Sequence, residues 1–122
     1  MITVVLVDDL PSARQGLRML LELEPDVTVV GEAGDGVAAL EVVARLNPDV
    51  VVVDLEMPHV DGIATIRALK RQGARALPIV HTIHDGAATR LIAAEAGAAF
   101  VAKHEGYPCL VAAIRALVRP PS

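Results

Sequence analysis

The segment VVVVDLEMPHVDG, residues 50–62, places an acidic residue directly after four consecutive valines. β-Branched residues favour extended backbone, and an uninterrupted apolar run is typical of a strand that is buried on both faces of a sheet. A carboxylate is an uncommon group at the edge of such a core. Asp54 is therefore either a turn or capping residue, or a residue that is placed there for its chemistry.

The rest of the chain alternates short apolar runs with amphipathic stretches. Besides 50–53, strands are expected at 2–7, 27–33, 77–82 and 99–102. Helices are expected at 12–24, 35–46, 61–73, 85–97 and 108–118. The expected N-terminal caps of the first four helices are Ser12, Asp35, Asp61 and Asp85, and Pro108 suits the first turn of the last helix.

This alternation predicts the fold class. Strands that are separated by helices pair in parallel through right-handed crossovers, which places helices on both faces of the sheet. Five such units are too few for a closed barrel of eight strands. We therefore expect one α/β domain over residues 1–118, with a flavodoxin-like, doubly wound, five-stranded parallel sheet in the order 2-1-3-4-5.

The composition indicates a soluble domain with an aliphatic core. The chain has 122 residues, of which 53% are hydrophobic, and a formal net charge of −4. Basic residues are scattered along the chain, with Lys70–Arg71 as the one adjacent pair, so this segment is not expected to bind nucleic acid by itself. It has a single cysteine, Cys109, and neither a signal peptide nor an apolar run of membrane-spanning length is visible. We expect a cytoplasmic location and no membrane contact.

Reactive side chains cluster after the expected strands, at the edge of an open α/β sheet where ligands bind. These residues are Asp8, Asp9, Asp54, Thr82 and Lys103. Two like charges about 4 Å apart repel by roughly 4 kcal/mol at an effective dielectric constant of 20, so a carboxylate cluster requires a cation. Hard oxygen ligands favour Mg²⁺. A carboxylate beside a metal, a lysine and a hydroxyl is a candidate nucleophile for phosphoryl transfer.

Several motifs carry a resemblance to a known family. The segments VVLVDD (4–9), VVVDLEMPHVDG (51–62), PIVHT (78–82) and AGAAFVAK (96–103) resemble the CheY-like receiver domain of two-component response regulators. The segments SARQGLRMLL, VGEAGDGVAAL and TIHDG are most similar to the NarL/FixJ, or LuxR-type, group. Each motif alone is weak, whereas the full set in the right order at the right strand ends is specific.

The resemblance implies a role for each acidic residue. Asp54 matches the aspartate that accepts a phosphoryl group from a sensor histidine kinase. Asp8 and Asp9 match the acidic pair that holds Mg²⁺ together with Asp54. Glu56 matches the residue whose backbone carbonyl completes the metal site, and Lys103 matches the lysine that contacts the phosphate.

The resemblance also implies a switch. Thr82 matches the hydroxyl that moves toward the phosphate, and Phe100 matches the aromatic residue that then turns inward. The surface formed by the fourth helix, the fifth strand and the fifth helix would then change its partner preference. Phe100 lacks the phenolic hydroxyl of a tyrosine switch. Lys103 is followed by His104 instead of the common proline, so the isomer of this peptide bond is left open.

The expected activity is that of a switch module, not of an enzyme with a separate substrate. The segment 119–122 reads as the start of a linker to a C-terminal helix-turn-helix domain that binds DNA. Dimerisation on phosphorylation is a further expectation. Two alternatives remain open: a pseudo-receiver that only mediates interactions, and a phosphatase with an aspartate nucleophile. Haloacid-dehalogenase-like phosphatases carry Asp-x-Asp after the first strand, whereas the acids are adjacent here.

Overall fold

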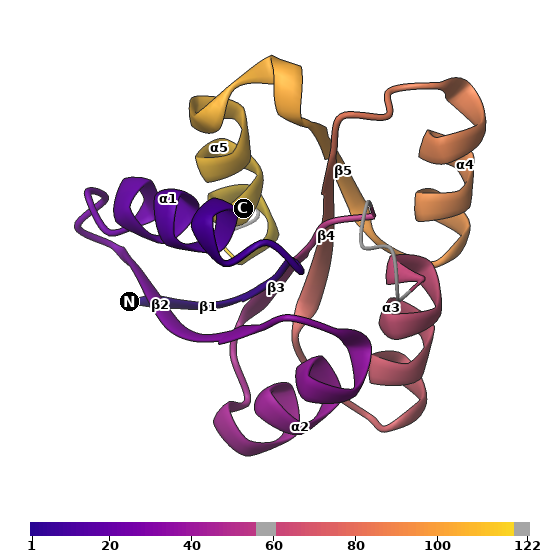
Figure 1. Cartoon of the computed structure of the whole chain (residues 1–122), viewed down its shortest axis with the longest axis horizontal. Helices are drawn as coiled ribbons and strands as arrows, with labels where there is room; N and C mark the ends of the chain where they lie inside the picture. The colour runs from indigo at the N-terminus through magenta and orange to yellow at the C-terminus, as the bar shows by residue number, and fades with distance from the viewer. Residues whose placement is uncertain (56–60, 119–122) are drawn as a thin grey trace.

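A computed structural model describes residues 1–55 and 61–118. Its centre is one parallel five-stranded sheet with the strand order β2-β1-β3-β4-β5, which confirms the predicted topology (Figure 1). The strands are β1 (Ile2–Val7), β2 (Val27–Ala33), β3 (Val50–Val53), β4 (Leu77–Thr82) and β5 (Ala99–Ala102). Each strand occupies the residues that the apolar runs predicted.

Helices cover both faces of this sheet. They are α1 (Pro11–Leu21), α2 (Gly36–Leu46), α3 (Gly62–Arg71), α4 (Ala87–Glu95) and α5 (Tyr107–Val118), and a short 3₁₀ turn, η1 (Lys103–Glu105), follows β5. Helices α1 and α5 lie on one face, and α2, α3 and α4 lie on the other (Figure 1). Among the described residues, no helix is both long enough and apolar enough to span a bilayer.

The valines of β3 contribute to two cores because side chains alternate along a strand. Val50 and Val52 pack in the cluster that α1 and α5 close, which includes Leu21 and Ile114. Val51 and Val53 belong to the cluster on the other face, under α2, α3 and α4. All four valines are at most 3% exposed. The apolar run is therefore the central strand of a sheet that is buried on both sides.

Two of the predicted helix caps are confirmed. The Asp35 carboxylate accepts a hydrogen bond from the Ala38 N–H, and the Asp61 carboxylate accepts one from the Ile63 N–H. Each of these contacts satisfies an N–H that has no partner within its helix. Gly73, which follows α3, has a φ of 79°, a left-handed conformation that favours glycine at a helix end.

The other two cap predictions are wrong. Helix α1 begins at Pro11, one residue before Ser12, since proline has no N–H and suits the first helical position. The residue before α4 is Gly86, and no side chain caps this helix. Asp85 instead pairs with the guanidinium of Arg90. Its carboxylate is therefore engaged by a charged partner and not by the helix N-terminus.

A carboxylate connects the start of β1 to the residue before β3. Asp49 Oδ2 accepts hydrogen bonds from the Thr3 N–H at 2.9 Å and from Thr3 Oγ1 at 3.1 Å. Asp49 Oδ1 lies 3.3 Å from a guanidinium nitrogen of Arg75. The hydrogen bond from the Thr3 backbone is the main reason that the pKa of Asp49 is lowered from its usual range. Because the folded protein favours the charged carboxylate, this contact stabilises the fold above pH 4.

We expect Asp49→Ala to reduce the free energy of unfolding by about 1–3 kcal/mol at pH 7, since it removes a charged acceptor from Thr3. Urea unfolding of both proteins measures this difference. Glu41→Ala removes an exposed carboxylate from α2 and serves as the control. The gap between wild type and Asp49→Ala should narrow as the pH falls through the lowered pKa of Asp49. A gap that is independent of pH would contradict this assignment.

Candidate functional site

The backbone ladder of the sheet carries two acidic residues to the same edge. The Asp54 N–H donates to the Val7 carbonyl at 3.0 Å, and the Asp8 N–H donates to the Ala33 carbonyl at 3.1 Å. Each residue directly follows its strand, and β1 and β3 are neighbours. The two acids are therefore held by hydrogen bonds that continue the sheet, and not by a mobile loop.

Asp54 is buried and pairs with a lysine. Its side chain is 8% exposed, and its Oδ2 lies 3.1 Å from Lys103 Nζ. Lys103 comes from the turn after β5, so the contact joins residues 49 positions apart in the chain. Burial of a carboxylate costs free energy unless a charge or hydrogen-bond donor compensates it. Lys103 supplies that charge at the predicted position.

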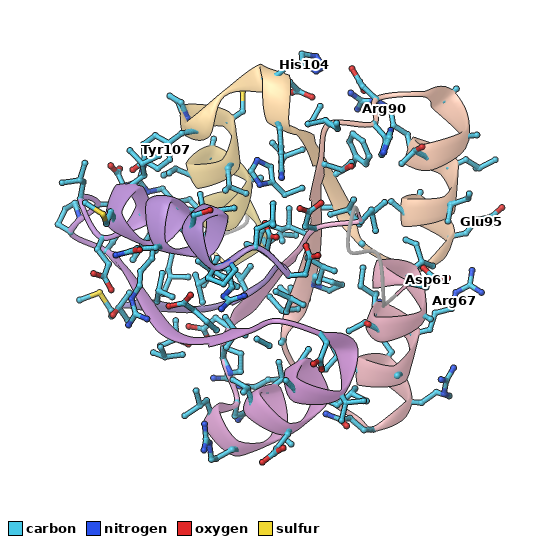
Figure 2. The ribbon with its side chains drawn as sticks, in the orientation of Figure 1. Asp61, Arg67, Arg90, Glu95, His104 and Tyr107 are labelled. Atoms are coloured by element: carbon cyan, nitrogen blue, oxygen red, sulfur yellow. The ribbon has the colours of Figure 1, made fainter. Side chains whose placement is uncertain are left out.

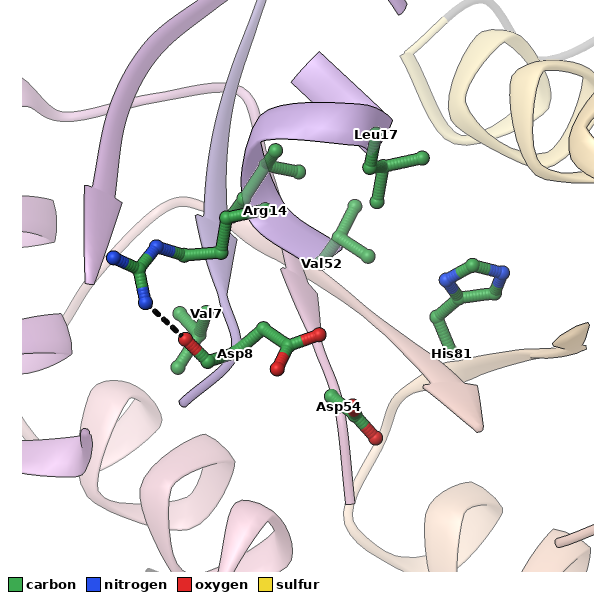
Figure 3. A pocket seen from close by; sticks show the side chains of 8 residues that line it. Val7, Asp8, Arg14, Leu17, Val52, Asp54 and His81 are labelled. Atoms are coloured by element: carbon green, nitrogen blue, oxygen red, sulfur yellow. Dashed lines mark hydrogen bonds between the residues drawn. The ribbon is translucent and has the colours of Figure 1, made fainter. Parts of the chain in front are cut away.

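Asp8 directs its carboxylate toward Asp54, as Figure 3 shows. Asp8 Oδ1 also accepts a hydrogen bond from the Leu10 N–H at 2.9 Å. Burial raises the pKa of Asp8, and the nearby charge of Asp54 and a hydrogen bond between the two carboxyl groups raise it further. The pair therefore holds more negative charge than is favourable, and a cation at this edge would relieve it.

The three predicted acidic side chains do not form a closed cluster. Asp9 is partly buried on the loop after β1. Within residues 1–55 and 61–118, no three His, Cys, Asp or Glu side chains gather closely enough to enclose a metal ion. Glu56, the predicted source of a carbonyl ligand, lies outside the described residues. The structure thus brings together Asp8, Asp54 and Lys103 from the predicted set.

The donors at this edge fit Mg²⁺. Asp8 and Asp54 offer hard carboxylate oxygens, and burial first, then the charge of Asp54, raise the pKa of Asp8. Mg²⁺ prefers such oxygens, binds through only one or two carboxylates and retains several waters. An open pair of carboxylates therefore suits this ion better than a closed cage would.

Thr82 ends β4 and is fully buried. Its Oγ1 accepts a hydrogen bond from the His84 N–H at 3.2 Å. In the parallel pairing of β4 with β5, Thr82 lies beside Ala102, and Val80 lies beside Phe100. Because side chains alternate, Thr82 and Phe100 belong to the same face of the sheet. Phe100 is partly buried and packs against the core on that face.

The turn after β5 begins with Lys103, which is followed by His104. The peptide bond between Lys103 and His104 is trans, as are all others in the described parts of the chain. The isomer of this peptide bond, which the sequence left open, is therefore trans. Lys103 reaches Asp54 from a turn that contains no cis bond.

Arg14 is a site residue that the sequence motifs did not single out. Its Nη1 donates to the Asp8 carbonyl at 2.5 Å (Figure 3). Its Nε lies 3.1 Å from Glu32 Oε1. Arg14, Asp8, Asp54 and His81 also line a small cavity of about 10 Å³, which has room for roughly one water molecule. The signal for Arg14 was its place one turn into the helix that follows the acidic pair.

Comparison with known proteins agrees with this arrangement. A family model described as the response regulator receiver domain matches residues 4–115. The nitrate/nitrite response regulator protein NarP of Escherichia coli is 41% identical over 114 residues, which cover 93% of this chain and 53% of NarP. The chain thus spans about half the length of this relative.

Solved structures of similar domains agree as well. The signal receiver domain of the putative response regulator NarL from Mycobacterium tuberculosis superposes with a TM-score of 0.90 at 33% identity, over 98% of both chains. The response regulator domain of Thermotoga maritima CheB superposes with a TM-score of 0.89 at 31% identity, over 99% of both chains. This chain belongs to the family of response regulator receiver domains of two-component systems.

Proposed function

We propose that Asp54 accepts a phosphoryl group from the phosphohistidine of a sensor kinase. The observation that carries this proposal is the contact of 3.1 Å between Lys103 Nζ and Asp54 Oδ2, beside Asp8 at the end of a buried strand. An Asp54 carboxylate oxygen attacks phosphorus, and the phosphorus–nitrogen bond to the kinase histidine breaks as the new phosphorus–oxygen bond forms. The product is an aspartyl phosphate.

The residues around Asp54 have distinct roles in this transfer. In this proposal Lys103, which contacts Asp54, pairs with a phosphoryl oxygen, so that positive charge is present before negative charge develops. Asp8, Asp9 and Asp54, with the Glu56 carbonyl, would hold Mg²⁺, which supplies charge neutralisation at the phosphoryl oxygens when it is bound. The rigid end of β3 positions the nucleophile.

Phosphorylation would then change a surface. In this proposal, Thr82 moves its hydroxyl toward the phosphate, and Phe100 follows into the space that Thr82 leaves. The surface of α4, β5 and α5 thereby alters its affinity for partners, including a second copy of the chain. The phosphate acts as a ligand that favours one of two packings, as in other population shifts.

The output of the whole protein is proposed to be transcription. This chain is similar, at 31% identity, to RcsB from Salmonella enterica in a structure bound to the promoter rprA. The match covers 98% of this chain and 61% of the RcsB chain. By analogy, residues 1–118 form the receiver and 119–122, which lie outside the described residues, begin a linker to a DNA-binding domain. In this proposal the domain is cytoplasmic and has no separate substrate.

Phosphorylation can be tested on the isolated chain. We expect acetyl phosphate with Mg²⁺ to add the mass of one phosphoryl group to the wild-type protein, because Asp54 and Lys103 are already in contact. Intact-mass spectrometry measures this change. The Asp54→Asn variant, which retains the size of the side chain, should not be modified. A wild-type chain that remains unmodified, also with a histidine kinase, would favour the pseudo-receiver, and turnover of a small phosphate ester would favour a phosphatase.

The metal site can be tested by binding alone. We expect Asp9→Asn to weaken Mg²⁺ binding by about tenfold or more, since it removes a negative charge from the acidic edge and since tenfold corresponds to about 1.4 kcal/mol. Titration with Mg²⁺, followed by the backbone amide resonances, measures the affinity. Glu41→Gln removes the same charge from the exposed face of α2 and should bind as wild type does. Equal affinities for wild type and Asp9→Asn would exclude Asp9 as a ligand.

A further inference from the structure

A cation covers the aromatic ring of Phe100. The guanidinium carbon of Arg90, on α4, lies 4.4 Å from the centroid of the ring. Phe100 is partly buried and packs against the core under α4. The ring is thus enclosed by apolar side chains on one side and by a guanidinium on the other. A contact at this distance is an attractive cation–π interaction.

Arg90 is itself held by two carboxylates. Its Nε donates to Asp85 Oδ1 at 2.7 Å, and its Nη2 donates to Glu105 Oε1 at 3.2 Å. Asp85 also lies 3.2 Å from His104 Nε2, and Glu105 accepts a hydrogen bond from the Ala102 N–H at 3.3 Å. Two carboxylates from outside α4 thus hold the guanidinium at the surface, beside the ring.

These anchors belong to the two segments that carry the switch and the phosphate contact. Asp85 lies in the loop that follows Thr82, and Glu105 lies in the turn that begins with Lys103. Figure 2 shows Arg90 and His104 at the same end of the molecule. The contacts of Arg90 therefore join the loop after β4 to the turn after β5.

The register of the sheet sets the direction in which Phe100 could move. Phe100 and Thr82 share a face of the sheet, on neighbouring strands, and Thr82 is the deeper of the two. A ring that moves toward Thr82 leaves the guanidinium, because Asp85 and Glu105 retain Arg90 at the surface. We call the observed place of the ring, under the Arg90 guanidinium, the covered position of Phe100.

We propose that Arg90 is a latch that holds Phe100 in the covered position and so sets how readily this domain switches. The proposal rests on the function proposed for Asp54. A phosphate on Asp54 would have to overcome the contact between Arg90 and Phe100, and the fraction of molecules that have already released Phe100 would limit the apparent affinity for a phosphate mimic. Arg90 acts through Phe100, so it is a positioning residue and not a catalytic one.

The sequence provides a direct probe, since Phe100 is the one phenylalanine of the chain. Protein labelled with ring-¹³C phenylalanine gives NMR signals from this ring alone. The signals are recorded for wild type and for Arg90→Met, first without ligand and then during titration with beryllofluoride and Mg²⁺. Arg90→Met retains apolar cover over the ring but removes the charge.

We expect Arg90→Met to shift the ring signals, without ligand, toward the position that wild type reaches with beryllofluoride. The half-saturating beryllofluoride concentration should fall about two- to fivefold, the range expected from the loss of an exposed cation–π contact. The ring signals and the half-saturating concentration of Arg90→Lys should lie between those of wild type and Arg90→Met, because an ammonium retains part of the attraction to the ring. Glu105→Gln, which weakens an anchor of Arg90, should shift the signals in the same direction.

A matched control separates the latch from a general effect of charge. Arg67→Met removes the same charge from the exposed face of α3, where Arg67 points away from Arg90 (Figure 2). The half-saturating beryllofluoride concentration of Arg67→Met should equal that of wild type. A purely structural role of Arg90 would lower the midpoint of thermal unfolding but would leave the half-saturating concentration unchanged.

Several outcomes would overturn the latch. One is that wild type and Arg90→Met have equal ring signals and equal half-saturating concentrations, while circular dichroism shows that the variant is folded. A second is that beryllofluoride shifts the amide signals near Asp54 but leaves the ring signals of Phe100 unchanged. This result would contradict the role of Arg90 and leave the function proposed for Asp54 intact. Failure of wild type both to bind beryllofluoride and to be phosphorylated would refute the function of Asp54, and the latch with it.

Discussion

The pair of buried Asp54 and partly buried Lys103 is the interaction on which the rest of this site depends. A carboxylate with 8% exposure would be unfavourable at the end of an apolar strand without a compensating charge. Lys103 supplies that charge at 3.1 Å, from a turn that only the folded sheet brings near. Among the described residues, the buried polar or charged side chains are Asp54, Thr65 and Thr82. Asp54 and Thr82 lie at this edge of the sheet, so polar side chains are buried here where apolar ones would otherwise pack.

The fold serves the site through the rigidity of the sheet. The valines of β3 are shared between two cores, so the strand cannot shift without disturbing both. The ladder continues one residue past β3, where the Asp54 N–H bonds to the Val7 carbonyl. Close packing adds a further constraint at the start of α3. A Cβ at Gly62 would lie 3.1 Å from the Asp54 carbonyl oxygen, so glycine lets the helix begin against the strand end.

The sheet could be predicted from the sequence because buried parallel strands are continuous apolar runs, and every strand lies where such a run predicted it. The edge that gathers Asp8, Asp54 and Lys103, with Thr82 at the end of β4, followed from the strand order and from the residues after each strand. The cap predictions were less successful because local patterns compete with tertiary contacts. Asp85 precedes a helix with the usual cap pattern, but Arg90 and His104 engage its carboxylate. The cover that Arg90 gives Phe100 had no sequence signal, since it depends on how α4 packs beside β5.

A crystal structure of the chain with Mg²⁺ and beryllofluoride tests the central claim most directly. This account predicts a beryllofluoride group bonded to a carboxylate oxygen of Asp54, with Lys103 Nζ within hydrogen-bond distance of a fluorine and Mg²⁺ against the side of Asp8 and Asp9. A structure in which the group binds elsewhere, or in which Lys103 turns away from a modified Asp54, would contradict the claim that Asp54, paired with Lys103, is the phosphoryl-accepting centre.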